Sequence, residues 1–214
     1  MNKIALIAAL ALAGSANAAT ISYSDSFGLS TTNWTENLTL QQFDSSLGTL
    51  NSVTFNYGGG ISTIFSLESL DAAAANISAN AVGNITFGGP INNTLHIAGS
   101  SSLSVTPFDG TIDFGGTSGG TVGPVVANDS NSIFYNSGFA AFIGNGTFDI
   151  LVAAIGLSNA NGAGNLISQI NTEAVANIEV VYNYSTTTNV PEPATMGLLG
   201  LGLLGLGAIR RRKA

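Results

Sequence analysis

Apolar and polar residues alternate along most of this chain, with the period of two that is typical of β-strands. In the clearest run, Ala176, Ile178, Val180, Tyr182 and Tyr184 alternate with mostly polar residues. Shorter alternating runs begin at Leu38, Val53, Ile61 and Leu95. Because successive side chains of a strand point to opposite faces, each run predicts a strand with one face in a core.

Other segments depart from simple alternation. Residues 148–155 are apolar almost throughout, which predicts a central strand buried on both faces. Residues 71–81 open with an N-cap type residue and are rich in alanine, which predicts a short helix. Four segments rich in glycine, asparagine or serine predict turns, at residues 58–60, 88–90, 115–120 and 159–165. Many short strands with turns about every ten residues predict an all-β fold, an antiparallel, jelly-roll-like β-sandwich.

Charge is scarce and unevenly distributed. Only 8% of the 214 residues are charged, against about 25% in an ordinary protein, and the net charge is −7. All the Lys and Arg residues lie at the two ends of the chain: Lys3, Arg210, Arg211, Arg212 and Lys213. Every Asp and Glu except Glu192 lies between residues 19 and 190.

This acidic body excludes several functions. Nucleic-acid binding depends on Lys and Arg that displace counterions, so we expect no nucleic-acid partner. Since residues 19–190 have no Lys or Arg, the body also cannot bind nucleotides through a lysine, form a Schiff base, or pair a substrate carboxylate with arginine. The chain also has no cysteine, which suits an exported protein that folds without disulfides.

The first 18 residues have the parts of a secretory signal peptide. Lys3 supplies the positive start, and residues 4–13 form an apolar run too short to span a bilayer. Ala16 and Ala18 place small residues at the positions that signal peptidase requires. We therefore predict a signal helix over residues 1–18, passage through the secretion translocon, and cleavage after Ala18.

A second apolar segment lies near the C-terminus. Residues 194–209 carry no charge and are rich in Leu and Gly. As a helix this segment spans about 24 Å at about 1.5 Å per residue, short of the roughly 30 Å hydrocarbon core. The bases that follow it, Arg210 to Lys213, fix the tail inside and the body outside. The segment therefore predicts a short transmembrane helix that anchors the chain transiently in the inner membrane.

Pro191, Glu192 and Pro193 stand just before this span. The order of a Pro-Glu-Pro motif, a short Gly/Leu-rich span and an Arg-rich end resembles the PEP-CTERM sorting signal, here residues 187–214. The resemblance implies recognition by an exosortase-type processing enzyme, in a Gram-negative bacterium that makes extracellular polysaccharide. It also implies removal of the tail. A plain single-span membrane anchor is the alternative.

Two segments of the body resemble a second family. Residues 42–50 read Gln-Phe-Asp-x-x-Leu-Gly-x-Leu, and residues 142–148 contain an aromatic-x-Gly-x-Gly-Thr motif. Both are similar to motifs of the choice-of-anchor E domain, which would span residues 19–186. That resemblance implies a surface location and no particular activity.

The first of these motifs also has a physical interpretation as a turn. We expect Phe43 to pack into the core, Asp44 to accept from backbone N–H groups, and Gly48 to adopt a conformation that other residues avoid. Leu47 and Leu50 are expected to be core anchors on either side of Gly48.

Candidates for catalysis are few. His96 lies on a predicted strand, where we expect a solvated side chain. Ser118 stands in a Gly-x-Ser-x-Gly pattern, but neither a helix nor a later histidine follows, as a nucleophile elbow requires. Gly200, Gly202 and Gly205 match a dinucleotide-binding pattern only because the tail is glycine-rich.

The acidic residues offer two further alternatives. Asp109 and Asp113 are spaced to share a strand face, as the paired acids of a glycosidase do. The same pair, or residues 128–131, has the oxygen ligands that Ca²⁺ prefers. We expect these acids to be turn and surface residues, with no catalytic, cofactor or metal site.

Together these patterns predict an exported, non-enzymatic surface or extracellular-matrix protein that associates with extracellular polysaccharide or biofilm. The alternatives are a polysaccharide hydrolase and a calcium-dependent adhesin module.

Overall fold

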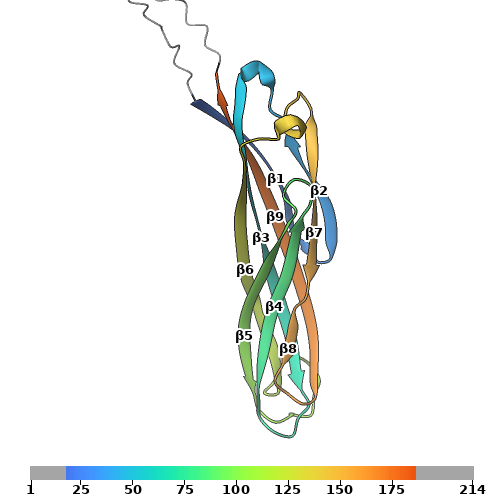
Figure 1. The fold of residues 1–214 in the computed structure, drawn as a ribbon. Coiled ribbons are helices and arrows are strands. Elements are labelled where there is room, and N and C mark those ends of the chain that lie inside the picture. Colours follow the sequence, from blue (N-terminus) through green and yellow to red (C-terminus); the bar gives the residue numbers. More distant parts are fainter. Residues whose placement is uncertain (1–17, 187–214) are drawn as a thin grey trace, which may run out of the picture.

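The computed structural model describes residues 18–186, and most of them lie in antiparallel strands, several of them long (Figure 1). One sheet has the strand order β1-β9-β3-β6, and we call it sheet A. The other has the order β2-β7-β4-β5, with β8 also paired to β4, and we call it sheet B. The two sheets face each other as a sandwich, so the predicted all-β, antiparallel architecture is confirmed.

The strands are β1 (Ala18–Thr31), β2 (Trp34–Gln41), β3 (Thr49–Ser69), β4 (Ala75–Phe87), β5 (Asn93–Val105), β6 (Gly119–Tyr135), β7 (Thr147–Gly156), β8 (Asn159–Asn161) and β9 (Leu166–Ser185). Two short 3₁₀ helices complete the fold: η1 (Ser45–Leu47) and η2 (Phe139–Phe142). The predicted signal helix and C-terminal transmembrane helix lie outside the described residues. Within residues 18–186, no helix is long and apolar enough to cross a membrane.

The core forms where the period-two pattern predicts it. In β9, Ala176, Ile178, Val180 and Tyr182 are all buried, while the residues between them face outward. Tyr184 of the same face is partly buried and packs against this core. The predicted strands beginning at Leu38, Val53, Ile61 and Leu95 bury their apolar faces in the same way.

The helix predicted over residues 71–81 is wrong. Asp71 caps no helix: its carboxylate accepts from the backbone N–H groups of Gly164 and Asn165, at 2.6 and 2.9 Å. From Ala75 onward the chain is strand β4, in which alternate side chains, including Ala79 and Ala81, are buried. Burial of one strand face therefore outweighs the helical propensity of the alanines.

Strand β7 is central, between β2 and β4, but it is not buried on both faces as predicted. Ile150 and Val152 are fully buried, whereas Leu151 and Ile155 are 53% and 48% exposed. The antiparallel sheet has a solvated outer face here, and that face accepts single apolar residues.

The turn predicted at residues 58–60 is also wrong, because β3 runs through all three glycines without a break. Gly59 faces the core, where a Cβ would overlap the side chain of Ile85 on the opposite sheet. Gly58 and Gly60 face outward. The glycines therefore allow a close approach between elements rather than a reversal of the chain.

The other predicted turns are confirmed wholly or in part. Residues 88–92 connect β4 to β5. Of residues 115–120, only 116–118 form the turn, and β6 begins at Gly119. Of residues 159–165, the first three form β8 and the rest bend into β9.

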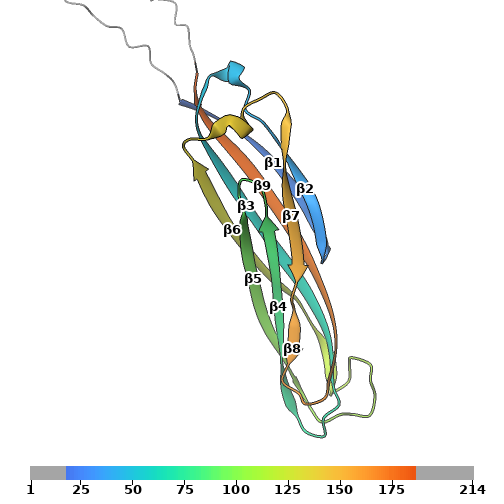
Figure 2. The ribbon, with the colours of Figure 1, turned by 45° about the vertical axis from the view of Figure 1, so that its right-hand side comes forward.

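Both ends of the described chain lie at the same end of the sandwich, as Figures 1 and 2 show from two sides. The reason is the register of β1 with β9, which places Ala18 opposite Ser185. The loops at residues 70–74, 106–118 and 162–165 gather at the opposite end. Strand β3 alone, with 21 residues, spans about 65 Å at about 3.3 Å per residue.

Candidate functional site

The residues predicted to direct sorting fall at or beyond the ends of the described chain. Ala18 is the first residue of β1, and Ala16 lies outside the described residues. Pro191, Glu192, Pro193 and the bases Arg210, Arg211, Arg212 and Lys213 also lie outside them. The chain therefore passes to the sorting segment from the end of the sandwich where both termini leave.

The predicted turn after β2 is formed much as expected. Asp44 is the N-cap of η1 and accepts from the backbone N–H of Ser46 at 2.8 Å, which holds the pKa of its carboxyl below the ordinary value. Phe43 and Leu50 are buried. Leu47 is 38% exposed, so its predicted role as a core anchor is wrong. It lies in a single 3₁₀ turn, which has no buried residue.

The two motif segments of the body contact each other in space. The N–H of Phe43 donates to the carbonyl of Phe142 at 2.7 Å, and the N–H of Gly144 donates to the carbonyl of Phe43 at 3.0 Å. The buried hydroxyl of Tyr182 donates to the carbonyl of Gln41 at 2.8 Å, and burial raises the pKa of this phenol strongly. These contacts close the end of the sandwich from which the termini leave, and they assemble no reactive group.

The two nucleophile or base candidates have other partners. His96 is exposed on β5, and its Nδ1 lies 2.9 Å from Oδ1 of Asn84. Ser118 is buried and donates to Oε1 of Glu68 at 2.6 Å. No pattern in the sequence singles out Glu68, which is fully buried beside Ser118. The other oxygen of this buried carboxyl has no hydrogen-bond partner among the described residues.

Asp109 and Asp113 do not share a strand face, because both lie in the loop between β5 and β6. Asp109 accepts from the N–H groups of Thr117 and Thr111, both at 3.1 Å, and these bonds lower the pKa of its carboxyl. Asp113 accepts from the N–H of Gly115 at 2.9 Å. Each acid thus orders its own turn, as expected. In the described part of the chain, no group of three or more His, Asp or Glu side chains could hold a metal ion.

Residues 128–131 form part of strand β6 rather than a calcium-binding loop. Asp129 and Asn131 each accept from the backbone N–H of the following residue at 2.8 Å. Asn128 and Ser130 lie on the outer face of sheet A, where they face strand β3. The predicted oxygen cluster is therefore divided between the two sides of the strand.

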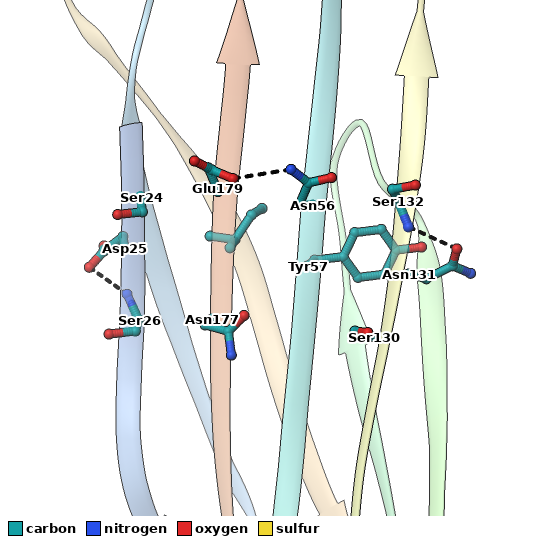
Figure 3. Close-up of a pocket in the computed structure, with 11 residues that line it drawn as sticks. Ser24, Asp25, Ser26, Asn56, Tyr57, Ser130, Asn131, Ser132, Asn177 and Glu179 are labelled. Atoms are coloured by element: carbon teal, nitrogen blue, oxygen red, sulfur yellow. Dashed lines mark hydrogen bonds between the residues drawn. The ribbon is translucent and has the colours of Figure 1, made fainter. Parts of the chain in front are cut away.

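A groove with a volume of about 850 Å³ crosses this outer face (Figure 3). Two rows of paired residues line it. One row runs through Ser24, Glu179, Asn56 and Ser132, and the other through Ser26, Asn177, Gly58 and Ser130. All four strands of sheet A thus contribute polar side chains to one surface.

Glycine on the central strand β3 makes this surface hollow. Gly58 lies between Asn177 and Ser130 in the register of the sheet. A second hollow of about 380 Å³ continues over Gly58 and Gly59 toward Asn128 and Val175. Because the outward-facing Gly58 and Gly60 have no side chain, the backbone of β3 forms the floor, and neighbouring strands form the walls.

Several polar side chains in the groove have no hydrogen-bond partner among the described residues. Asn56 Nδ2 donates to Oε2 of Glu179 at 3.1 Å. In contrast, the hydroxyls of Ser24, Ser26 and Ser130 make no hydrogen bond to another group of residues 18–186. The groove therefore offers donors and acceptors that water or a ligand can use.

The sequence did not single out this groove, although one signal was present. Where Asn-x-Ser/Thr falls within a strand, Asn and the Ser or Thr two positions later lie on the same face, as Asn128 and Ser130 do on the outer face of β6. Asn84 and Thr86 follow the same rule on β4. Within strands, the pattern thus marks outer faces that are rich in hydroxyls and amides.

Comparison with protein families identifies the tail. Residues 189–213 match the family described as the PEP-CTERM protein-sorting motif. This motif implies an exported protein that is sorted and processed by an exosortase-type enzyme. The match covers the tail alone, so the resemblance of residues 19–186 to the choice-of-anchor E domain stays a prediction. None of the curated proteins matches the chain.

Among solved structures, the chain is similar to several from infectious bursal disease virus. The VP2 subviral particle is 14% identical over 87% of this chain and 48% of that chain, with a TM-score of 0.15. The Gx strain structure is 13% identical over 87% of this chain and 47% of that chain, with a TM-score of 0.11. The chain thus spans about half the length of these structures. At such TM-scores the similarity supports no conclusion about fold or function.

Proposed function

We propose that this protein is a non-enzymatic component of the cell surface or extracellular matrix of a Gram-negative bacterium, where it associates with extracellular polysaccharide. The pairing of Ala19 with Tyr184, at the start of the predicted mature chain, carries the proposal. It brings both termini to one end of a long sandwich and leaves the rest of the body free to extend from the site of sorting.

The non-enzymatic part of the proposal rests on the acids near the groove. Asp25 borders the groove beside Glu179, but both of its oxygens accept backbone N–H bonds. One of these donors is Thr39 of β2, at 2.7 Å, so the carboxylate of Asp25 is directed toward the other sheet. A pair of carboxylates facing one substrate, as a glycosidase requires, is not formed by these residues.

Trp34 does not supply a sugar platform in this groove either. Its ring packs on Phe27 with centroids 4.7 Å apart, and its indole nitrogen is buried. We therefore favour a binding or structural role over hydrolysis, and we propose that the body folds and acts without a metal or cofactor.

The proposed route has four partners. The translocon and signal peptidase act first, and residues 194–209 then hold the chain briefly in the inner membrane. The exosortase-type enzyme removes this tail, and the mature chain reaches the extracellular polysaccharide.

Fractionation of cells that carry a matching exosortase tests this proposal. We expect a form without the tail to sediment with the polysaccharide matrix, and enzymatic digestion of that polysaccharide to release it. A processed chain that stays soluble in the medium whether or not the polysaccharide is present would contradict the association. Hydrolysis of the polymer by the purified chain would contradict the non-enzymatic role.

A further inference from the structure

We propose that the groove over Gly58, on the outer face of sheet A, binds neutral polysaccharide in preference to anionic polymers. The inference rests on the proposed association with polysaccharide, to which it adds a binding site and a ligand class. Three features of the groove support it: its shape, its hydrogen-bonding groups and its charge.

The shape suits an extended ligand. The volume of about 850 Å³ lies within the roughly 300–1,000 Å³ that is usual for ligand sites. The groove is open, and the second hollow continues it along β3 over Gly59. A polymer can therefore bind along the groove through its internal units, whereas a closed pocket would admit only the end of a chain.

The hydrogen-bonding groups suit sugar hydroxyls. Hydroxyls both donate and accept, and amides offer one group of each kind, so Ser26, Ser130 and Asn177 can pair with a ligand that presents many hydroxyls. Glu179 is held by Asn56 through Oε2, which leaves Oε1 as an acceptor at the groove. Fixed polar groups of this kind orient a ligand in an open site.

The charge excludes the other polymers that could lie here. Between residues 19 and 190 there is no Lys or Arg, so no cation is available for carboxylate, sulfate or phosphate groups. Nucleic acids and anionic polysaccharides would meet Glu179 and the other acids of the body. A second copy of this chain would bring the same acidic surface. A neutral polyhydroxyl chain meets no such repulsion.

An exposed aromatic ring adds apolar contact near the groove. Phe134 is 61% exposed and follows Ser132 by two positions on β6, so it leaves the same outer face. It lies opposite Thr54 in the register. The C–H faces of a sugar ring can pack on such a ring by dispersion and apolar burial.

Affinity electrophoresis of the full 214-residue chain tests the proposal. The gels contain hydroxyethyl cellulose or galactomannan as neutral polymers, or alginate as the anionic polymer. The test variant Ser130→Trp fills the groove from edge strand β6. Its matched control, Ser100→Trp, places the same side chain at an exposed position of edge strand β5 on the other sheet.

We expect at least one neutral polymer to retard the parent, and alginate not to. Ser130→Trp should weaken the apparent affinity at least about tenfold, whereas Ser100→Trp should change it less than about twofold. Phe134→Ser should weaken it by a smaller factor. Thermal unfolding of each variant shows that loss of binding does not reflect loss of the fold.

The possible failures are distinguishable. Equal binding by the parent and Ser130→Trp would overturn the groove as the site, and stronger retardation by alginate would overturn the neutral class. Either result leaves the association with polysaccharide standing. A parent that no polymer retards would count against both the association and the inference.

Discussion

Gly48 lies where the turn after β2 meets the last residues of β9. Its φ of 150° is one that side chains rarely adopt, and a Cβ there would overlap the carbonyl oxygen of Ser185. We expect Gly48→Ala to lower the free energy of unfolding by about 2–4 kcal/mol, because backbone strain and overpacking each cost about 1–3 kcal/mol. Thermal or denaturant unfolding measures the change.

Gly138 provides the matched control. Its φ is 76°, but no atom lies within 4 Å of the position a Cβ would take. Gly138→Ala should therefore cost only the backbone term, about 1–2 kcal/mol. An equal cost for the two variants would show that Gly48 is not required for the close approach to Ser185.

Asp109 should make stability depend on pH. Its bonds from Thr117 and Thr111 lower its pKa below the ordinary 3.8. A carboxyl whose folded-state pKa is depressed stabilises the protein above its unfolded-state pKa, and that contribution is lost as the pH falls through the folded-state pKa. Asp109→Asn should therefore melt below the parent at about pH 6 and closer to it at about pH 2.5. A melting difference that does not vary with pH would exclude the charge as the cause.

At the scale of elements, alternation predicted strands β2, β3, β5 and β9 and their buried faces, as in β9 between Ala174 and Tyr182, where each buried residue is apolar. It failed where small residues dominate, because Ala79 and Gly59 carry little hydrophobic signal although both face the core. Local sequence patterns could not predict the groove for a further reason. It requires the register that brings Asn56 beside Glu179, which is 123 positions away.

The close approach of the two sheets at Gly59 is testable as a coupling. A Cβ at this position would overlap Cδ1 of Ile85 and lie 2.7 Å from the carbonyl oxygen of Val175. We expect Gly59→Ala to cost about 1–3 kcal/mol from overpacking. Ile85→Val removes Cδ1 and should cost about 0.5–1.5 kcal/mol alone. The double variant should lose less stability than the sum of the two single losses, by at least about 0.5 kcal/mol.

Gly28→Ala on β1 is the control for that cycle, because nothing lies within 4 Å of its Cβ position. Its cost should not depend on residue 85. If the costs of Gly59→Ala and Ile85→Val were additive, the two sheets would not be in close contact at this point, and the effect of Gly59 would be confined to strand β3.

At the scale of the whole molecule, the mature N-terminus should be Ala19. Ala16 and Ala18 place small residues where signal peptidase requires them. Cleavage after Ala18 removes one pair from the ladder and leaves Ala19 opposite Tyr184. Mass spectrometry of the exported protein measures the terminus, and retention of Met1 would contradict the signal peptide.

The sorting tail gives the last prediction. The motif at residues 189–213 follows the end of the sandwich at which Ala18 lies opposite Ser185, so we expect the processing enzyme to approach this end of the body rather than a face. Deletion of Pro191, Glu192 and Pro193 should leave an unprocessed chain in the inner membrane, because the enzyme loses its recognition segment while the apolar span remains. Fractionation and mass spectrometry of the tail measure this.

A companion variant replaces the bases from Arg210 to Lys213 with neutral residues, and its effect should differ from that of the deletion. Without positive charges on its inner side, the short, glycine-rich span has less to stop it, and the tail should pass through the membrane uncleaved. The two variants thus separate recognition from retention. If the chain without Pro191 to Pro193 were processed and exported like the parent, the segment would not be the recognition site, and a simple anchor would explain the tail better.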